Sequence, residues 1–239
     1  FAYPESKVYA VTGLDFSVKK GEMIGVIGGT GSGKSTLVQM IPRFYDVAEG
    51  SVTVDGEDVR NYKIEELRKK IGMVPQRAVL FRGTIRDNMK VGNEDADDEQ
   101  IMEAIRTAQA LEVVEGKPDG LDTLISEGGK NLSGGQKQRL TIARALVRKP
   151  QILILDDSAS ALDVATDARL RKSVKGLKDM TVFVVSQRAA SVMQADRIIV
   201  MDDGKIAGIG THDELMKSCE VYREICLSQL SEKEVGQHA

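Results

Sequence analysis

The sequence predicts an α/β protein in which a parallel β-sheet is flanked by helices. Short apolar runs of strand length alternate along the chain with segments whose apolar residues recur at helical spacing, and a glycine-rich turn joins the first such pair. Strands that alternate with helices are typical of a parallel sheet. No apolar run approaches the roughly 18 residues that a membrane-spanning helix needs, so the runs are expected to be buried strands.

Composition restricts the class of protein. The chain has 239 residues, of which 41% are hydrophobic and 29% charged, as expected for a globular unit of one or two domains. A net charge of -3 gives no overall attraction to nucleic acid or to an anionic membrane. The only cysteines, Cys219 and Cys226, indicate no disulfide framework, which favours a reducing compartment. The chain opens on Phe1 without a methionine or a basic leader, so we expect a domain cut from a longer protein.

The predicted elements begin with a strand, a loop and a helix. Residues 23–27 form a buried strand, a glycine-rich loop follows, and residues 35–41 form a helix. Residues 51–59 contain a strand and an Asp55-Gly56 turn. The first 70 residues are therefore expected to mix β hairpins with the loop.

The middle of the chain is predicted to be helical. Strand signals nearly vanish from about residue 97 to residue 149, where apolar positions have helical spacing over 101–111 and 136–148. The α/β core then resumes with strands at 151–155, 181–185 and 197–201 and a final helix at 213–230.

The glycine-rich loop matches a phosphate-binding motif. Residues 28–35 read Gly-Gly-Thr-Gly-Ser-Gly-Lys-Ser, which is the pattern Gly, four residues, Gly-Lys-Ser/Thr, between a predicted strand and helix. The glycines let backbone amides converge on phosphate oxygens, Lys34 adds a full charge, and Ser35 can place a hydroxyl on Mg²⁺. The residues predicted here to bind nucleotide are Gly28, Gly29, Thr30, Gly31, Ser32, Gly33, Lys34, Ser35 and Thr36.

Two acids close the apolar strand at 151–155. Asp156 and Asp157 follow Ile-Leu-Ile-Leu directly, and buried strands of α/β folds place ligand groups at their carboxyl ends. Asp156 is predicted to hold Mg²⁺, directly or through water, and Asp157 to address the attacking water. Two acids after a strand are often an ordinary turn, but the phosphate loop upstream favours the functional interpretation.

A second helix start has the features of a phosphate site. Leu-Ser-Gly-Gly-Gln at 132–136 precedes a strong helix, and Ser133 and Gln136 have the spacing of a capping box. A cap needs no paired glycines, whereas Gly134 and Gly135 leave amides bare for an anion. Since the first loop already binds one ATP, the second is predicted to serve an ATP held by another copy or a related partner. The sequence therefore predicts that the chain dimerises around bound nucleotide.

The order of these three motifs resembles that of the ABC ATPases, over nearly the whole chain. The resemblance implies a P-loop NTPase that forms one domain over 1–239. A RecA-like core and an antiparallel β subdomain take 1–76 and 150–239, and a helical subdomain takes about 77–149. It also implies further roles for single residues, with Tyr3 stacking on adenine, Gln76 contacting Mg²⁺ and coupling to the membrane domain, and 160–163 crossing a dimer interface.

Several segments resemble the exporter branch of that family. They are 80–88, with Leu-Phe-Arg-Gly-Thr-Ile-Arg-Asp-Asn, then 127–131, with Glu-Gly-Gly-Lys-Asn, and 208–215, with Gly-Ile-Gly-Thr-His-Asp-Glu-Leu. The resemblance implies transmembrane domains fused before Phe1 and a position on the cytoplasmic face of the cell membrane. It also implies ATP and Mg²⁺ as cofactors. The exported substrate stays open.

Two residues depart from the family pattern. Asp157 stands where the family usually has glutamate after the magnesium aspartate, and Gln187 stands where it usually has a switch histidine. The shorter aspartate would place its carboxylate more than about 1 Å short of the water, a misplacement that can cost roughly 10²-fold in rate. Gln187 can still hydrogen-bond a γ-phosphate but cannot carry a histidine's charge. Both departures weaken the same half-site.

That pattern resembles the degenerate subunit of heterodimeric multidrug exporters. The chain's own site is expected to turn over slowly, while its intact signature at 132–136 completes an active site on a non-identical partner. The alternatives are a nucleotide-binding structural or regulatory module without transport, and an ordinary homodimeric exporter ATPase. A chromosome-organising ATPase would need a long coiled coil between Ser35 and Ser133, and no sustained heptads occur there. His212, near a helix start, reads as a cap or surface residue and is given no catalytic role.

Overall fold

The computed structural model describes residues 1–4, 6, 8–158, 160–177 and 179–229. The chain divides into two compact units, the first formed by Phe1–Ile71 with Phe183–Ala239 and the second by Gly72–Val182. Across the described residues, no helix is both long and apolar enough to cross a membrane.

Four strands form the sheet of the first unit, in the order β10-β9-β1-β8. β1 and β9 run parallel, with Ile24 opposite Arg197 and Ile27 opposite Val200, and β10 pairs antiparallel to β9. All residues of β1 and β8 are buried, as expected for strands that are covered on both faces and read as continuous apolar runs. The bounds are β1 Met23–Ile27, β8 Thr181–Ser186, β9 Arg197–Asp202 and β10 Lys205–Gly210.

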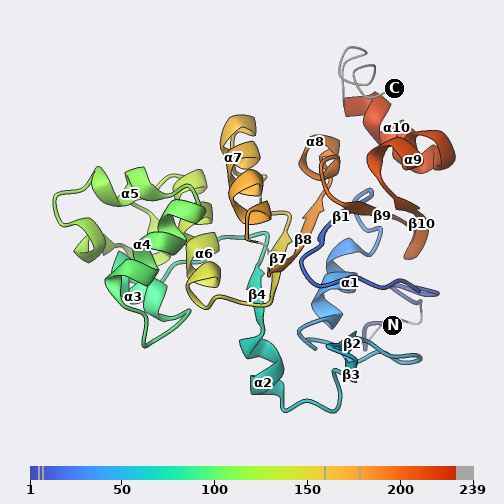
Figure 1. Ribbon diagram of the computed structural model, residues 1–239, viewed down its shortest axis with the longest axis horizontal. Coiled ribbons are helices and arrows are strands. Elements are labelled where there is room, and N and C mark those ends of the chain that lie inside the picture. The colour runs from blue at the N-terminus through green and yellow to red at the C-terminus, as the bar shows by residue number, and fades with distance from the viewer. Residues whose placement is uncertain (5, 7, 159, 178, 230–239) are drawn as a thin grey trace. The chain divides into compact units, whose positions relative to one another are not determined.

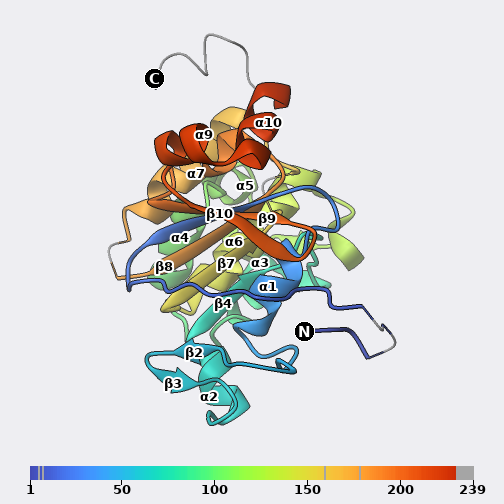
Figure 2. The ribbon, with the colours of Figure 1, turned by 90° about the vertical axis from the view of Figure 1, so that its right-hand side faces the viewer.

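Helices cover both faces of this sheet. α1 lies on one side of β1 and β9, and α8, α9 and α10 lie on the other (Figures 1 and 2). A hairpin of β2 and β3 turns at Asp55-Gly56, where both residues have positive φ, as a two-residue hairpin turn requires. The bounds are α1 Lys34–Met40, β2 Thr53–Val54, β3 Glu57–Asp58, α2 Ile64–Lys69, α8 Ala189–Val192, α9 His212–Ser218 and α10 Glu220–Gln229.

The second unit combines two core strands with a helical cluster, drawn mostly in green in Figure 1. β7 lies beside β4, and the short strands β5 and β6 pair antiparallel. α6 is packed by α3 and α4, and its Leu140, Ile142 and Ala143 are fully buried. The bounds are β4 Ile71–Val74, β5 Gly83–Thr84, α3 Ile85–Lys90, α4 Asp98–Thr107, α5 Leu111–Glu115, β6 Leu124–Ile125, α6 Gly134–Val147, β7 Ile152–Asp156 and α7 Val164–Lys175, with single 3₁₀ turns at Gly120–Asp122 and Glu127–Gly129.

The predicted α/β class, the core strands, the helix after the glycine-rich loop and the helix near 136–148 are confirmed, with ends that differ by one or two residues. Three expectations need correction. The helical segment expected over 101–111 is interrupted, because α4 ends at Thr107 and α5 begins at Leu111. The single C-terminal helix over 213–230 is two helices, separated by Cys219 in an extended conformation, and residue 230 lies outside the described residues. Of the hairpins expected in the first 70 residues, the described part contains only that of β2 and β3.

Candidate functional site

The phosphate loop lies between β1 and α1, as the motif predicts. Gly33, the N-cap of α1, has φ 95°, and a Cβ there would lie 2.7 Å from Val11 Cγ1. At Gly28 a Cβ would lie 2.1 Å from the carbonyl oxygen of Met201. Glycine is required at both positions, because a side chain would be strained at the first and would collide with the backbone of β9 at the second.

Lys34 is the buried cation of this loop. Its side chain turns back so that Nζ donates to the carbonyl oxygens of Gly28 at 2.8 Å and Gly29 at 2.6 Å. Only 8% of the residue is exposed. Neutral carbonyls are weaker acceptors for an ammonium group than phosphate oxygens. A bound phosphate can therefore replace the carbonyls as the hydrogen-bond acceptor of Lys34.

Two side chains from elsewhere in the first unit reach the loop or the helix that follows it. Thr30 Oγ1 donates to Gln187 Oε1 at 3.3 Å, which brings the predicted switch residue to the phosphate loop. The hydroxyl of Tyr3 lies 2.8 Å from Thr36 Oγ1. The Tyr3 ring also packs edge-on against Phe1 and Tyr45, at centroid distances of 5.0 and 5.2 Å. The predicted adenine-stacking residue is therefore anchored to α1.

The second unit holds the two strand-end acids. Asp156 ends β7 and is 4% exposed. Asp157 has φ 47°, a left-handed conformation, and its Oδ2 accepts a hydrogen bond from Gln76 Nε2 at 2.9 Å. The structure thus brings together two residues that the sequence analysis had placed in one site by motif order alone. The left-handed turn and this bond fix the direction of the Asp157 carboxylate.

The signature segment forms the predicted capping box in full. Ser133 Oγ accepts from the Gln136 amide at 3.2 Å, and Gln136 Oε1 accepts from the Ser133 amide at 3.0 Å. A Cβ at Gly134 would meet nothing within 4 Å, whereas one at Gly135 would lie 3.3 Å from the Ala161 carbonyl oxygen. Packing against the loop at 160–163 explains Gly135. It does not explain Gly134, which leaves the anion-binding interpretation open at that position.

Arg139 holds the signature turn to the helical cluster, a role that no motif in the sequence indicates. Its guanidinium donates to the carbonyls of Gly135 at 3.3 Å and Gln109 at 2.5 Å, and it forms an ion pair with Glu112 at 2.5 Å. Gln109 has φ 58°, and this non-glycine turn ends α4 before α5. No signal local to the sequence identifies these contacts, because Arg139 lies 30 residues after Gln109.

The loop at 160–163 ends at the N-cap of α7. Asp163 accepts a 2.9 Å hydrogen bond from the amide of Thr166. That backbone bond, with one from the Thr166 hydroxyl, lowers the pKa of the Asp163 carboxyl below its ordinary value. The loop therefore ends in a group that remains ionised at neutral pH.

Magnesium would be held by few protein groups. Among the described residues, no group of three or more histidine, cysteine or acidic side chains could hold a metal ion. Mg²⁺ in phosphate-transfer sites is bound by one or two carboxylates together with substrate phosphates, and the predicted donors Ser35, Gln76 and Asp156 include one carboxylate.

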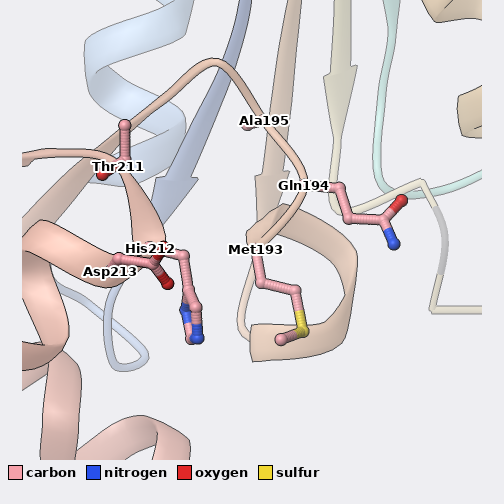
Figure 3. Close-up of a pocket in the computed structure, with 6 residues that line it drawn as sticks. All are labelled: Met193, Gln194, Ala195, Thr211, His212 and Asp213. Atoms are coloured by element: carbon pink, nitrogen blue, oxygen red, sulfur yellow. The ribbon is translucent and has the colours of Figure 1, made fainter. Parts of the chain in front are cut away.

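His212 is a core residue rather than the surface or cap residue expected. It begins α9, is 7% exposed, and its Nδ1 lies 2.8 Å from the hydroxyl of the fully buried Tyr222. It also borders a cavity of about 190 Å³ between the segments 193–195 and 211–213. Figure 3 shows Met193 on one side of that space and His212 on the other, with Gln194 extending away. The contact with Tyr222 gives His212 a structural role.

A strand, a glycine-rich loop with a buried lysine and a following helix define a P-loop NTPase. The family model described as ABC transporter matches residues 11–160 of the chain. The chain therefore belongs to the ABC transporter family.

Relatives and a solved structure agree with this assignment. An uncharacterized ABC transporter ATP-binding protein of Mycobacterium tuberculosis is 45% identical over 99% of this chain, and the match covers 41% of that protein. The ATP-dependent lipid A-core flippase of Chromobacterium violaceum is 41% identical over 97% of this chain and is covered over 40% of its length. A bacterial Atm1-family ABC exporter with ATP bound has a TM-score of 0.91 at 34% identity, covering 96% of this chain and 41% of that one. The chain thus spans about two fifths of the proteins that it matches.

Proposed function

We propose that this chain binds Mg-ATP and dimerises around it to power export of a substrate across a membrane. The observation that carries the proposal is the phosphate loop, where Lys34 is buried and bonded to neutral loop carbonyls that the stronger phosphate acceptors can replace. The family binds ATP, and the similar Atm1-family exporter has ATP bound.

Within this proposal each part of the chain has a separate task. The residues of the phosphate loop bind the phosphates, Tyr3 stacks on the adenine, and Ser35, Gln76 and Asp156 hold Mg²⁺. Bound Mg²⁺ would neutralise charge on the phosphate oxygens. We also keep the proposal that residues 1–239 form one ABC ATPase domain, with the helical subdomain at about 77–149.

We further propose that the chain's own site hydrolyses ATP slowly. Asp157 offers a carboxylate one methylene shorter than the glutamate that the family usually has. Gln187 reaches the phosphate loop through Thr30, but as a neutral amide. Both side chains can form hydrogen bonds, but Asp157 lacks the reach of a glutamate and Gln187 lacks the charge of a histidine. The site is therefore suited to holding nucleotide.

The partner in this proposal is a second, non-identical ABC ATPase domain. The signature residues Ser133, Gly134, Gly135 and Gln136 would complete the partner's site, where glutamate and histidine are present. The well-formed cap at Ser133 and the open space at Gly134 support a signature competent for that task. Transmembrane domains in the same polypeptide, for which the greater length of the relatives leaves room, would place this domain at the cytoplasmic face of the cell membrane.

Nucleotide binding tests the first part of the proposal. We expect Lys34→Ala to weaken Mg-ATP binding by roughly tenfold to 10²-fold in a calorimetric titration, since a hydrogen bond to a charged group contributes about 1.5–3 kcal/mol. The matched control is Lys117→Ala, because Lys117 is exposed. A chain that binds no Mg-ATP, or a Lys34→Ala variant that binds as well as the Lys117→Ala control, would refute the proposal.

An ordinary homodimeric exporter ATPase is the second candidate. The Gln76 bond to Asp157 favours it, because an oriented carboxylate can act as a general base even when it is short. Turnover separates the two candidates. Slow phosphate release by the chain alone, and faster release when a partner with the glutamate and histidine is added, supports the heterodimer. Equally fast release by the chain alone supports the homodimer.

A further inference from the structure

The turn that carries Gln187 lacks a cap of its own. β8 ends at Ser186 and α8 begins at Ala189, so only Gln187 and Arg188 join them. The N-cap residue of α8 is Arg188, which makes no side-chain capping bond. The first amides of a helix have no partner within the helix, so the amide of Ala189 needs an acceptor from elsewhere in the chain.

Gln229 of α10 supplies that acceptor. Its Oε1 accepts from the Ala189 amide at 2.9 Å, and its Nε2 donates to the Gln187 carbonyl oxygen at 2.8 Å. One planar amide therefore bonds the two backbone groups on either side of Arg188, with the donor and the acceptor each facing their complement. A residue 40 positions beyond Ala189 in sequence holds the turn from outside.

The same turn is held from the phosphate loop. Gln187 Oε1 accepts from Thr30 Oγ1 at 3.3 Å, and Ser186 Oγ accepts from the Arg188 amide at 3.0 Å. All of these residues belong to the first unit. Gln187 is thus bonded through its backbone to α10 and through its side chain to the loop proposed to bind phosphate.

We infer that Gln229 is a positioning residue for Gln187, and that it couples the docking of α10 to the recognition of the terminal phosphate of ATP. The inference rests on the proposed function, in which Gln187 faces the γ-phosphate. A side chain on a two-residue turn can bond a phosphate well only if the turn itself is fixed. Gln229 fixes it at the carbonyl of Gln187 and at the amide two residues later.

ADP lacks the phosphate that Gln187 would meet, so the inference predicts an effect on ATP and none on ADP. We expect Gln229→Ala to reduce the preference for ATP over ADP by roughly threefold to tenfold, the range that corresponds to the net value of one hydrogen bond. Gln229→Glu keeps the acceptor for Ala189 but sets an oxygen against the Gln187 carbonyl, so it should lose the preference as well.

The experiment is a titration of the 239-residue chain with ATP and with ADP in the presence of Mg²⁺. The matched control is Glu224→Ala, an exposed position on the same helix. Adding Gln187→Ala to Gln229→Ala should change the ratio no further than Gln187→Ala alone, because the two residues act through one contact. Hydrogen exchange of the Ala189 amide should speed up in Gln229→Ala and stay unchanged in the control.

The possible failures can be told apart. A wild type that binds neither nucleotide refutes the proposed function, and this inference with it. A wild type that prefers ATP, with Gln229 variants that keep the same preference, overturns the inference alone. Variants that lose ATP and ADP affinity in equal measure also overturn it, because they show that Gln229 only supports the fold.

Discussion

Lengthening the side chain at position 157 tests the proposed slow site most directly. Asp157 Oδ2 is held by Gln76 Nε2 at 2.9 Å, on a backbone turned by its positive φ. The replacement Asp157→Glu adds one methylene without changing the charge, so the carboxylate can advance by roughly 1 Å. A misplacement of about 1 Å in a catalytic group costs roughly 10²-fold in rate, or about 2.7 kcal/mol of activation free energy.

Gln187→His adds a smaller gain to the same site. The hydrogen bond to Thr30 shows that the Gln187 side chain already reaches the phosphate loop. Replacing it with histidine would therefore add a charge to the site rather than extend the reach of the side chain. Hydrogen bonds to charged groups contribute about 1 kcal/mol more free energy than hydrogen bonds between neutral groups, which corresponds to roughly fivefold in rate. Taken as independent, the two gains predict that the double replacement raises turnover by roughly 500-fold.

The assay is steady-state release of phosphate from Mg-ATP by the chain, alone and with a candidate partner. Asp119→Glu is the matched control, since it makes the same change at an exposed site. Lys34→Ala in the double variant measures the background from contaminating ATPases. If the wild type alone is already fast, or if the double replacement leaves the rate unchanged, the reasoning about Asp157 and Gln187 is wrong.

Three further predictions concern the frame of the site. Arg139→Lys should lower the free energy of unfolding in urea by about 1–3 kcal/mol, because an ammonium group cannot reproduce the guanidinium contacts with Glu112 and two carbonyls; equal midpoints would contradict this. Tyr222→Phe should cost about 1–3 kcal/mol by removing the buried hydroxyl partner of His212 Nδ1, and an unchanged thermal midpoint would argue against it. The hydrogen bond from the amide of Thr84 lowers the pKa of the Asp87 carboxyl. The wild type should therefore be more stable than Asp87→Asn above the ordinary aspartate pKa of about 3.9, and should lose this advantage as pH falls through the lowered pKa. A stability difference that is constant with pH would exclude this origin.

Features with signals close together in the sequence could be predicted. The phosphate loop, the hairpin turn at Asp55-Gly56 and the capping box of Ser133 with Gln136 all depend on residues within a few positions of each other. The roles assigned to the site residues stay predictions, because they depend on nucleotide, metal and partner.

Features set by packing between distant segments could not be predicted. The bond from Gln76 to Asp157 joins residues 81 positions apart, and that from Gln229 to Gln187 joins residues 42 apart. The break between α9 and α10 falls at Cys219 without a glycine or proline to indicate it. The buried residues Leu215, Cys219, Tyr222 and Cys226 have the spacing of one continuous helical face, so the sequence pattern favours an unbroken helix there.

The residues that this chain retains argue against a site that has simply lost its function. Nucleotide binding is predicted to depend on Lys34, Ser35 and Asp156, and all three stand in their motifs. The two departures, Asp157 and Gln187, fall only on groups that would act on the attacking water and the terminal phosphate. Each still makes a hydrogen bond to another predicted site residue. If the site had simply lost its function, substitutions would be expected at the binding residues too. Their restriction to Asp157 and Gln187 favours a site that holds nucleotide while a partner's site turns over.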